Sequence, residues 1–234
     1  MATQHESGLG AKLKRAQDLI TYLNGFSNYN PPRPEESIAQ LTTLTGSIAA
    51  ANAAADGQRE IYRLAVDDRQ KIFRDDESSV LKVLSPLRGA VEAQYGKESK
   101  QTTIISGLVR GMRSSKITKS PADPANDKAV STSQQSYGSM AQQFSHIVSA
   151  LQSFGNYDPS NASLKIAALE QKIQSIDTIN NTIATSIQQL SVNRSNRTAL
   201  YEDLGERAQR VKSYIRAEYG NQSQEYRLIK GLSI

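Results

Sequence analysis

The stretch IAALEQKIQSIDTINNTIATSIQQL (166–190) carries the pattern that decides the fold. Apolar residues recur in it at alternating steps of three and four, and a single asparagine interrupts the series. The series consists of Ile166, Leu169, Ile173, Ile176, Asn180, Ile183, Ile187 and Leu190. Such spacing, sustained over about four heptads, defines a seam of a and d positions. It predicts a long amphipathic helix that packs against other helices.

The same register continues towards the C-terminus. It reaches Tyr201, Leu204, Ala208, Val211 and Ile215. Between the two parts, Arg194 and Arg197 occupy seam positions within the polar segment SVNRSNR (191–197). Either one very long helix or an antiparallel helical hairpin fits this pattern. Because a segment rich in Ser and Asn is typical of a turn, we favour the hairpin.

The chain also repeats itself, which indicates an internal duplication. A shift of 128 residues places FSNYNPPRPEESIAQL (26–41) over FGNYDPSNASLKIAAL (154–169), with seven of sixteen positions identical. Further on the shift falls to 124, and AQYGKESKQTTIISGL (93–108) matches AEYGNQSQEYRLIKGL (217–232), again at seven of sixteen positions. The difference of four residues is close to one helical turn. It predicts an extra turn or a stutter in the first copy.

The duplication divides the chain into four parts. A polar N-terminal tail (1–10) precedes the first repeat (11–112), and a linker (113–134) precedes the second repeat (135–234). The linker is rich in Ser, Pro, Lys and Asp, and its SPADP segment cannot continue a helix. Each repeat is predicted to hold a leading helix, a proline-bearing corner, and one or two long helices.

We therefore predict an all-α protein, built by tandem duplication of a helical-bundle unit with long amphipathic helices. The two repeats form either one bundle with internal pseudo-two-fold symmetry or two bundles in series, and the sequence leaves both open. Pro86 is expected to kink or end the last long helix of the first repeat. TTIISGLVR (102–110) is the one segment that also fits a short extended piece.

Both repeats close on the same phrase, in which Tyr-Gly precedes a serine. The glycines are expected to end a helix with a left-handed residue, and the serines to cap the segment after it. We interpret this phrase as a helix-stop motif, formed by Tyr95, Gly96 and Ser99 and by Tyr219, Gly220 and Ser223. A phosphate-cradling loop is the alternative, but no Gly-x-Gly or Lys-Ser/Thr pattern supports it.

The second copy of this phrase, YGNQSQEYRLIKGL (219–232), resembles the C-termini of uncharacterised bacterial helical-bundle proteins with a YGxxSxEY-type segment. The resemblance covers these residues alone. It implies a helical fold and no activity, because that group has none to carry over.

Asn52 and Asn180 share one position of the repeat and fall at an a position of the seam. A buried Asn at such a position costs stability but sets helix register and partner choice. We therefore consider the two residues as possible register-setting sites. The alternative is a polar residue on a partly exposed helix face.

The sequence contains few residues in patterns suited to catalysis or metal binding. The chain contains no Cys and only two His, His5 and His146, and it has no Glu-x-x-His pair. No Gly-x-Ser-x-Gly, Walker or dinucleotide-binding pattern occurs. The carboxylates of RDDESS (74–79) lack regular spacing and are interpreted as a solvated helix end. We expect no enzymatic activity, no cofactor and no metal.

The composition favours a cytoplasmic protein without a membrane segment. No apolar run follows a basic start, so no secretory signal is expected. The segment IAQLTTLTGSIAAANAAA (38–55) has no charge, but its Gln, Thr, Ser and Asn content is too polar for a good membrane span. The formal net charge of +5 is mild for a chain of 234 residues.

A basic run follows the first repeat. It consists of Arg110, Arg113, Lys116 and Lys119, and it contains no acidic residue. Such a run could contact phosphates, but no aromatic residue or known reading module accompanies it, so nucleic-acid binding is disfavoured.

The function expected from these observations is structural. Two similar helical units in one chain offer two similar docking surfaces, which suits self-association into a homo-oligomer, a ring or a filament. A monomeric or dimeric adaptor that binds another protein is the first alternative. A nucleic-acid-associated protein that uses segment 110–119 is the second.

Overall fold

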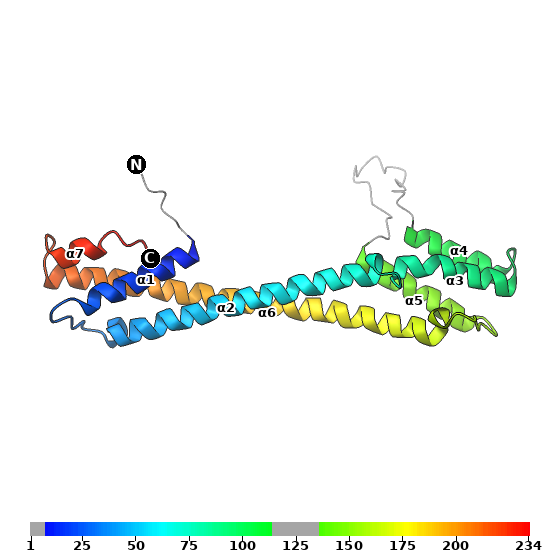
Figure 1. Ribbon diagram of the computed structural model, residues 1–234, viewed down its shortest axis with the longest axis horizontal. Coiled ribbons are helices and arrows are strands. Elements are labelled where there is room, and N and C mark those ends of the chain that lie inside the picture. The colour runs from blue at the N-terminus through cyan, green and yellow to red at the C-terminus, as the bar shows by residue number, and fades with distance from the viewer. Residues whose placement is uncertain (1–7, 114–135) are drawn as a thin grey trace, which may run out of the picture. The chain divides into compact units, whose positions relative to one another are not determined.

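The computed structural model describes residues 8–113 and 136–234, and within these ranges the chain is helical without any strand (Figure 1). The all-α prediction is therefore confirmed for the described residues. Most of the N-terminal tail (1–10) and of the linker (113–134) lies outside them, as do Lys116, Lys119 and His5.

The described helices form two series along the chain, one before residue 114 and one after residue 135. The first repeat contains α1 (Leu9–Asn24), η1 (Pro34–Glu36), α2 (Ile38–Gln70), η2 (Lys71–Asp75), α3 (Val80–Tyr95) and α4 (Lys100–Arg113). The second contains α5 (Tyr137–Ser153), η3 (Ala162–Leu164), α6 (Ile166–Glu218) and α7 (Gln224–Ile229). The elements η1 and η3 are short 3₁₀ helices in the corners, and η2 is a π-helical segment.

The chain folds into two compact units whose boundaries differ from those of the repeats. Unit 1 comprises Met1–Tyr62 and Ser186–Ile234, and unit 2 comprises Arg63–Thr185. Unit 1 thus combines the beginning of the first repeat with the end of the second, and unit 2 combines the remaining parts. The long helices α2 and α6 each contribute a part to both units.

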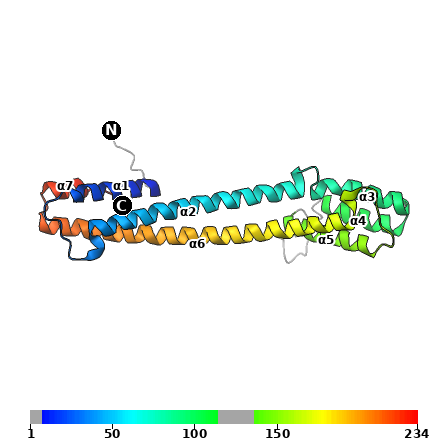
Figure 2. The same ribbon diagram turned by 60° about the horizontal axis from the view of Figure 1, so that its bottom comes forward.

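Unit 1 is held together by aliphatic side chains from α1, α2, α6 and α7. Figure 2 shows α1 and α7 lying along the parts of α2 and α6 that belong to this unit. One core cluster consists of Leu19, Leu23, Leu41, Ala208, Val211, Ile215 and Ile229. A second, adjoining α1, consists of Ala16, Leu44, Ile48, Tyr201 and Leu204.

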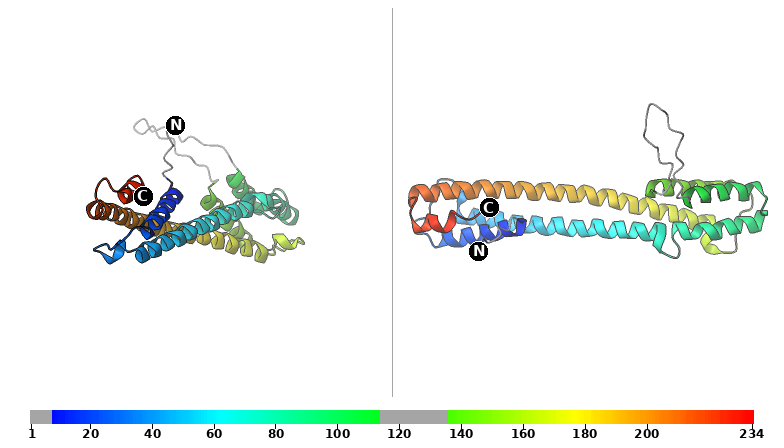
Figure 3. Two further views of the ribbon diagram at one scale, coloured as in Figure 1. Left: turned by 60° about the vertical axis from the view of Figure 1, so that its left-hand side comes forward. Right: turned by 90° about the horizontal axis from the view of Figure 1, so that it is seen from above.

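Unit 2 has one larger core. In the right-hand view of Figure 3, the green helices α3, α4 and α5 lie together. The most buried large side chains of this core are Phe73, Leu84, Leu87, Ile105, Met112, Met140, Phe144 and Ile147. The first part of α6 adds Leu169 and Ile176 to the same cluster. The helix α5, the leading helix predicted for the second repeat, therefore buries one face in this core.

The hairpin favoured for the second repeat is wrong, because α6 runs unbroken through SVNRSNR (191–197). The segment contains no Pro or Gly that would break a helix. Its polar groups also find helical partners. Asn193 Nδ2 donates to the Ala54 carbonyl oxygen of α2 (3.1 Å), and Thr198 Oγ1 donates to the Arg194 carbonyl oxygen (3.0 Å). The polar side chains therefore form hydrogen bonds to helical carbonyl oxygens and do not form a turn.

The first repeat differs from the second where the shift changes from 128 to 124. There α2 gives way to η2, and a break at residues 76–79 precedes α3, whereas α6 continues through the corresponding region. The carboxylates of RDDESS lie at this break, at the end of η2. The helix α3 does not end at Pro86 but continues to Tyr95. Residues 102–110 belong to α4, so the extended alternative for them is wrong.

Because each unit combines segments from both halves of the chain, we expect the protein to stay together after a cut between the halves. If a protease site is inserted between Arg113 and Ser136 and cut, the two fragments should stay bound, because each unit needs segments from both. Size-exclusion chromatography of the cut protein, followed by gel electrophoresis, should show both fragments in one peak. Separate elution of the fragments without denaturant would contradict the shared units.

Candidate interaction surfaces

The helix-stop residues lie at corresponding places in the two units. Gly96 follows the end of α3 with a φ of 89°, and Gly220 lies just beyond α6 with a φ of 94°. A side chain at either position would be strained. The Ser99 Oγ accepts a hydrogen bond from the Thr102 backbone N–H, and the Ser223 Oγ accepts one from the Tyr226 N–H, both at 3.1 Å. These serines cap α4 and α7.

The tyrosines of the motif join the end of one repeat to the corner of the other. Tyr219 donates its hydroxyl hydrogen to the Ser27 carbonyl oxygen (2.5 Å), and its ring centroid lies 6.0 Å from that of Phe26. In unit 2, Tyr95 donates to the Gly155 carbonyl oxygen (2.7 Å), and its ring lies 5.9 Å from Phe154. The motif therefore acts as a structural clasp in both units.

The corners themselves are held by a second pair of tyrosines. Tyr29 donates to the Glu36 carbonyl oxygen (2.7 Å), and Tyr157 donates to the Leu164 carbonyl oxygen (3.1 Å). Burial, reinforced by the Glu36 carboxylate, raises the pKa of Tyr29 well above its usual range. Burial also raises the pKa of Tyr157 to about 12, with a smaller contribution from Tyr95. Both hydroxyls are thus held in the protonated, donating form.

These raised pKa values predict a loss of stability in alkali. The pKa of Tyr157 is 10.0 in the unfolded chain and about 12 in the folded one. Its contribution to stability is therefore complete below pH 10 and disappears as the pH rises from 10 to 12, because only the unfolded chain gains the charge. Urea denaturation across this range should show the midpoint falling more steeply for the native chain than for Tyr157→Phe. Equal slopes would contradict the assignment.

One contact distinguishes the two corners. The Glu36 side chain is only 4% exposed, and its carboxylate accepts a hydrogen bond from Arg210 Nε at 2.5 Å. Leu164, the residue that aligns with Glu36, is equally buried in unit 2. The periodicity of the apolar residues did not identify Glu36 as a buried residue. A signal was present in the repeat, because a shift of 128 places this carboxylate over a core leucine.

The two seam asparagines have different surroundings. Asn52 Nδ2 donates to the Tyr201 hydroxyl (3.0 Å), which in turn donates to the Leu9 carbonyl oxygen (2.7 Å). Its Oδ1 is buried without a hydrogen-bond partner among the described residues. Asn180 is half-buried. The position that aligns with Tyr201 is Phe73, which has no hydroxyl to offer in unit 2. Asn52 is therefore part of a buried polar chain that the aligned residues of unit 2 cannot reproduce.

This chain of hydrogen bonds predicts the effect of a small substitution. Tyr201→Phe should lower the free energy of unfolding by about 1–3 kcal/mol, because the Asn52 amide and the Leu9 carbonyl oxygen lose their partner. Urea denaturation monitored by circular dichroism measures this change. Tyr62→Phe is a matched control, since the described residues show no hydrogen bond to the Tyr62 hydroxyl. A Tyr201→Phe variant as stable as the control would refute the polar chain.

The basic run is only partly described. Arg110 and Arg113 lie in the last turn of α4, and Arg113 Nη2 donates to the Leu81 carbonyl oxygen (3.0 Å). Arg113 also borders a hollow of about 250 Å³ together with Arg74 and Lys82. Lys82 Nζ is engaged by Glu77 Oε1 and by the Asp75 carbonyl oxygen. Arg113 and Lys82 therefore have hydrogen-bond partners within unit 2.

Potential metal ligands are scattered in the part of the chain that the structure describes. Among these residues, no three His, Cys, Asp or Glu side chains are grouped so that they could hold an ion. His146 lies on α5 within the described chain.

The predicted seam is interrupted in the middle of α6. Between Ile183 and Tyr201 the buried positions are Ser186 and Leu190, whereas Ile187 is 50% exposed and Arg194 is also exposed. The seam prediction is therefore wrong at Ile187 and Arg194. The heptad register itself is kept, because Leu190, Tyr201, Leu204, Ala208, Val211 and Ile215 are buried at the predicted positions.

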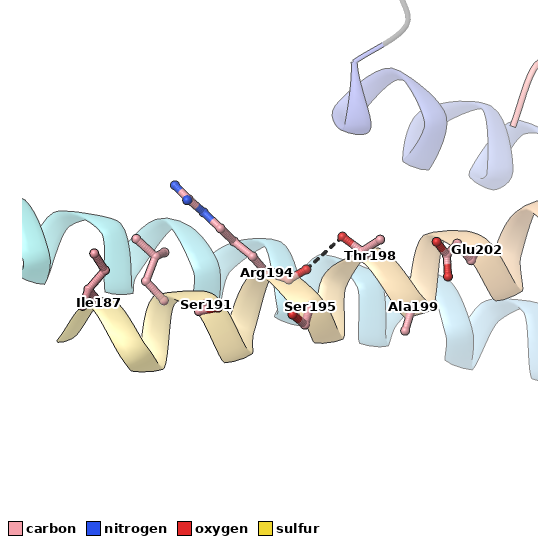
Figure 4. A pocket seen from close by; sticks show the side chains of 8 residues that line it. Ile187, Ser191, Arg194, Ser195, Thr198, Ala199 and Glu202 are labelled. Carbon is pink, nitrogen blue, oxygen red and sulfur yellow. Dashed lines mark hydrogen bonds between the residues drawn. The ribbon is translucent and has the colours of Figure 1, made fainter. Parts of the chain in front are cut away.

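Ile187 and Arg194 belong to a stripe on the surface that we call the outer face of α6. Figure 4 shows most of its side chains along one side of the helix. It consists of Ile187, Leu190, Ser191, Arg194, Ser195, Thr198, Ala199 and Glu202, all in unit 1. These residues border an open groove of about 560 Å³. Leu190 is buried, and the other seven are exposed.

In this part of unit 1, large and small residues are distributed in an unusual way. Residues 51–62 of α2 and 186–198 of α6 bury only Ala51, Ala55, Ser186 and Leu190. In the same stretch Ile61, Ile187 and Val192 are 51%, 50% and 55% exposed. Three of the four buried side chains are thus small, while large aliphatic side chains face outwards. Ordinary globular packing has the opposite arrangement.

None of the described helices combines the length and the apolar character that crossing a bilayer requires. Comparison of the chain with protein-family models, with curated proteins and with solved structures gives no match. The geometry of the candidate surfaces is therefore the basis on which a function can be assigned.

Proposed function

We propose that this chain is a non-catalytic structural protein that associates with copies of itself through its helical faces. The observation that carries the proposal is the reversed packing in unit 1, where Ile61, Ile187 and Val192 stay half exposed above a contact made mostly of Ala and Ser. A layer of two helices with such a thin core gains little from hydrophobic burial, and a further helical layer would cover the exposed aliphatic side chains.

The free energy gained by covering these aliphatic side chains supports self-association. Full burial of an Ile or Val side chain is worth about 1.5–3 kcal/mol, so covering each half-exposed side chain is worth about 1 kcal/mol. Single exposed apolar residues are common on protein surfaces and need no explanation. Here they share one short stretch with a small-residue contact, and Arg194 in the same stretch is exposed as well.

We also infer that the chain arose by tandem duplication of a helical unit. Support comes from corresponding residues in corresponding conformations. Asn28 and Asn156 both have positive φ, at 60° and 63°, and Gly96 and Gly220 have 89° and 94°. The Nε atoms of Arg69 and Arg197, which are 128 residues apart, are both buried without a partner in the described chain. A duplicated chain presents similar faces more than once, which suits repeated association.

The proposal predicts a mass that depends on concentration. Light scattering of the purified full chain, over a series from about 1 μM to about 1 mM, should show species larger than the 25.6 kDa monomer. Substituting Ile61 and Val192 together by Gln should shift the association to higher concentration. The exposed Leu228 on α7, changed to Gln, is a control of the same chemistry outside the reversed stretch.

A monomer at every concentration would refute self-association and favour the adaptor alternative, in which another protein covers the same aliphatic side chains. Binding of nucleic acid would favour the second alternative, and its affinity should then fall steeply with salt.

A further inference from the structure

The outer face of α6 carries one charge of each sign, and neither has a partner in the described chain. Arg194 and Glu202 are both exposed, and no salt bridge between described residues includes either of them. They lie eight residues apart on one helix, which corresponds to about 12 Å along its axis. This separation is too long for an ion pair, so the two side chains cannot neutralise each other within one copy.

Thr198 lies midway between these two charges. If two α6 helices run antiparallel about a two-fold axis at Thr198, a residue four positions before it faces the residue four positions after it in the second copy. Arg194 of each copy then meets Glu202 of the other, and two identical ion pairs form. A two-fold axis requires such a self-complementary surface.

We propose that a second copy of this chain docks on the outer face of α6, antiparallel to it, with the two-fold axis at Thr198. This proposal rests on the self-association proposed above and names one contact for it, which covers Ile187 of the three half-exposed aliphatic side chains. The two ion pairs favour the antiparallel orientation, because a parallel pair in register would place like charges together.

The shape of the face suits a close approach of two helices. Ser191 and Ser195 have small side chains and lie within about 60° of Thr198 around the helix, so the helix axes can approach towards the short end of the usual range of about 8–10 Å. The Thr198 hydroxyl already donates to the Arg194 carbonyl oxygen, as the dashed line in Figure 4 shows, and so needs no new partner in the interface. Ile187 supplies an aliphatic edge.

Charge reversal tests the pairing directly. Arg194→Glu would place two acidic residues opposite each other, and Glu202→Arg would place two basic residues opposite each other. Each single variant should weaken dimer formation by about tenfold or more, measured by light scattering or analytical ultracentrifugation at low salt. The double variant should restore it, because opposite charges face each other again. Both sites are exposed, so circular dichroism should show unchanged helicity in all three variants.

A cysteine probe tests the position of the axis, and the chain has no native cysteine to interfere. Thr198→Cys should form a disulfide-linked dimer under mild oxidation. Asn196→Cys is the matched control, because residue 196 is exposed and lies about 200° around the helix from residue 198. Only the first variant should cross-link efficiently.

The outcomes separate this proposal from the more general one. If the native chain self-associates but the single charge reversals have no effect, this interface is overturned and self-association stands. The same holds if the Asn196→Cys variant cross-links as readily as the Thr198→Cys variant. If the double reversal fails to restore a loss seen in both single variants, the specific pairing is overturned. If the native chain stays monomeric at all concentrations, both proposals fall.

Discussion

The helix α6 continues without a break from residue 166 to residue 218, and this continuity determines which segments of the chain meet. Its first part belongs to the core of unit 2 and its last part to the core of unit 1. The end of the second repeat therefore packs with the beginning of the first. The tyrosine clasps follow from this exchange, because Tyr219 reaches the corner at Ser27 and Tyr95 reaches the corner at Gly155.

Similar repeats raise a problem of specificity, because either corner could in principle meet either helix end. The pair formed by Glu36 and Arg210 addresses this problem. A carboxylate buried at the corner is tolerated where an arginine donates to it, and it would be costly opposite an apolar surface. In unit 2, the aligned residue Leu164 is buried and requires apolar neighbours. The two corners are thus chemically different although Asn28 and Asn156 share a positive φ.

The same continuity creates the surface on which the functional proposals depend. In the middle of α6 the buried side chains are Ser186 and Leu190, while the seam residue Ile187 is half exposed. Ile187 and Arg194 belong to the outer face. Their apolar and charged side chains are then available for a second copy, whereas small residues remain between α2 and α6.

Periodicity and self-similarity were sufficient to predict the helical fold of the described residues, the leading helices, and the glycines near the ends of α3 and α6, because these depend on local spacing and on the backbone freedom of glycine. The course of SVNRSNR could not be predicted in the same way. Ser and Asn favour turns in isolation, but here Asn193 has a carbonyl partner on α2 that only the packed helices supply. The exchange of repeat ends, the burial of Glu36 and the exposure of Ile187 likewise depend on which helices lie side by side. Contacts between residues far apart in the chain decide such features, and a local pattern contains no information about them.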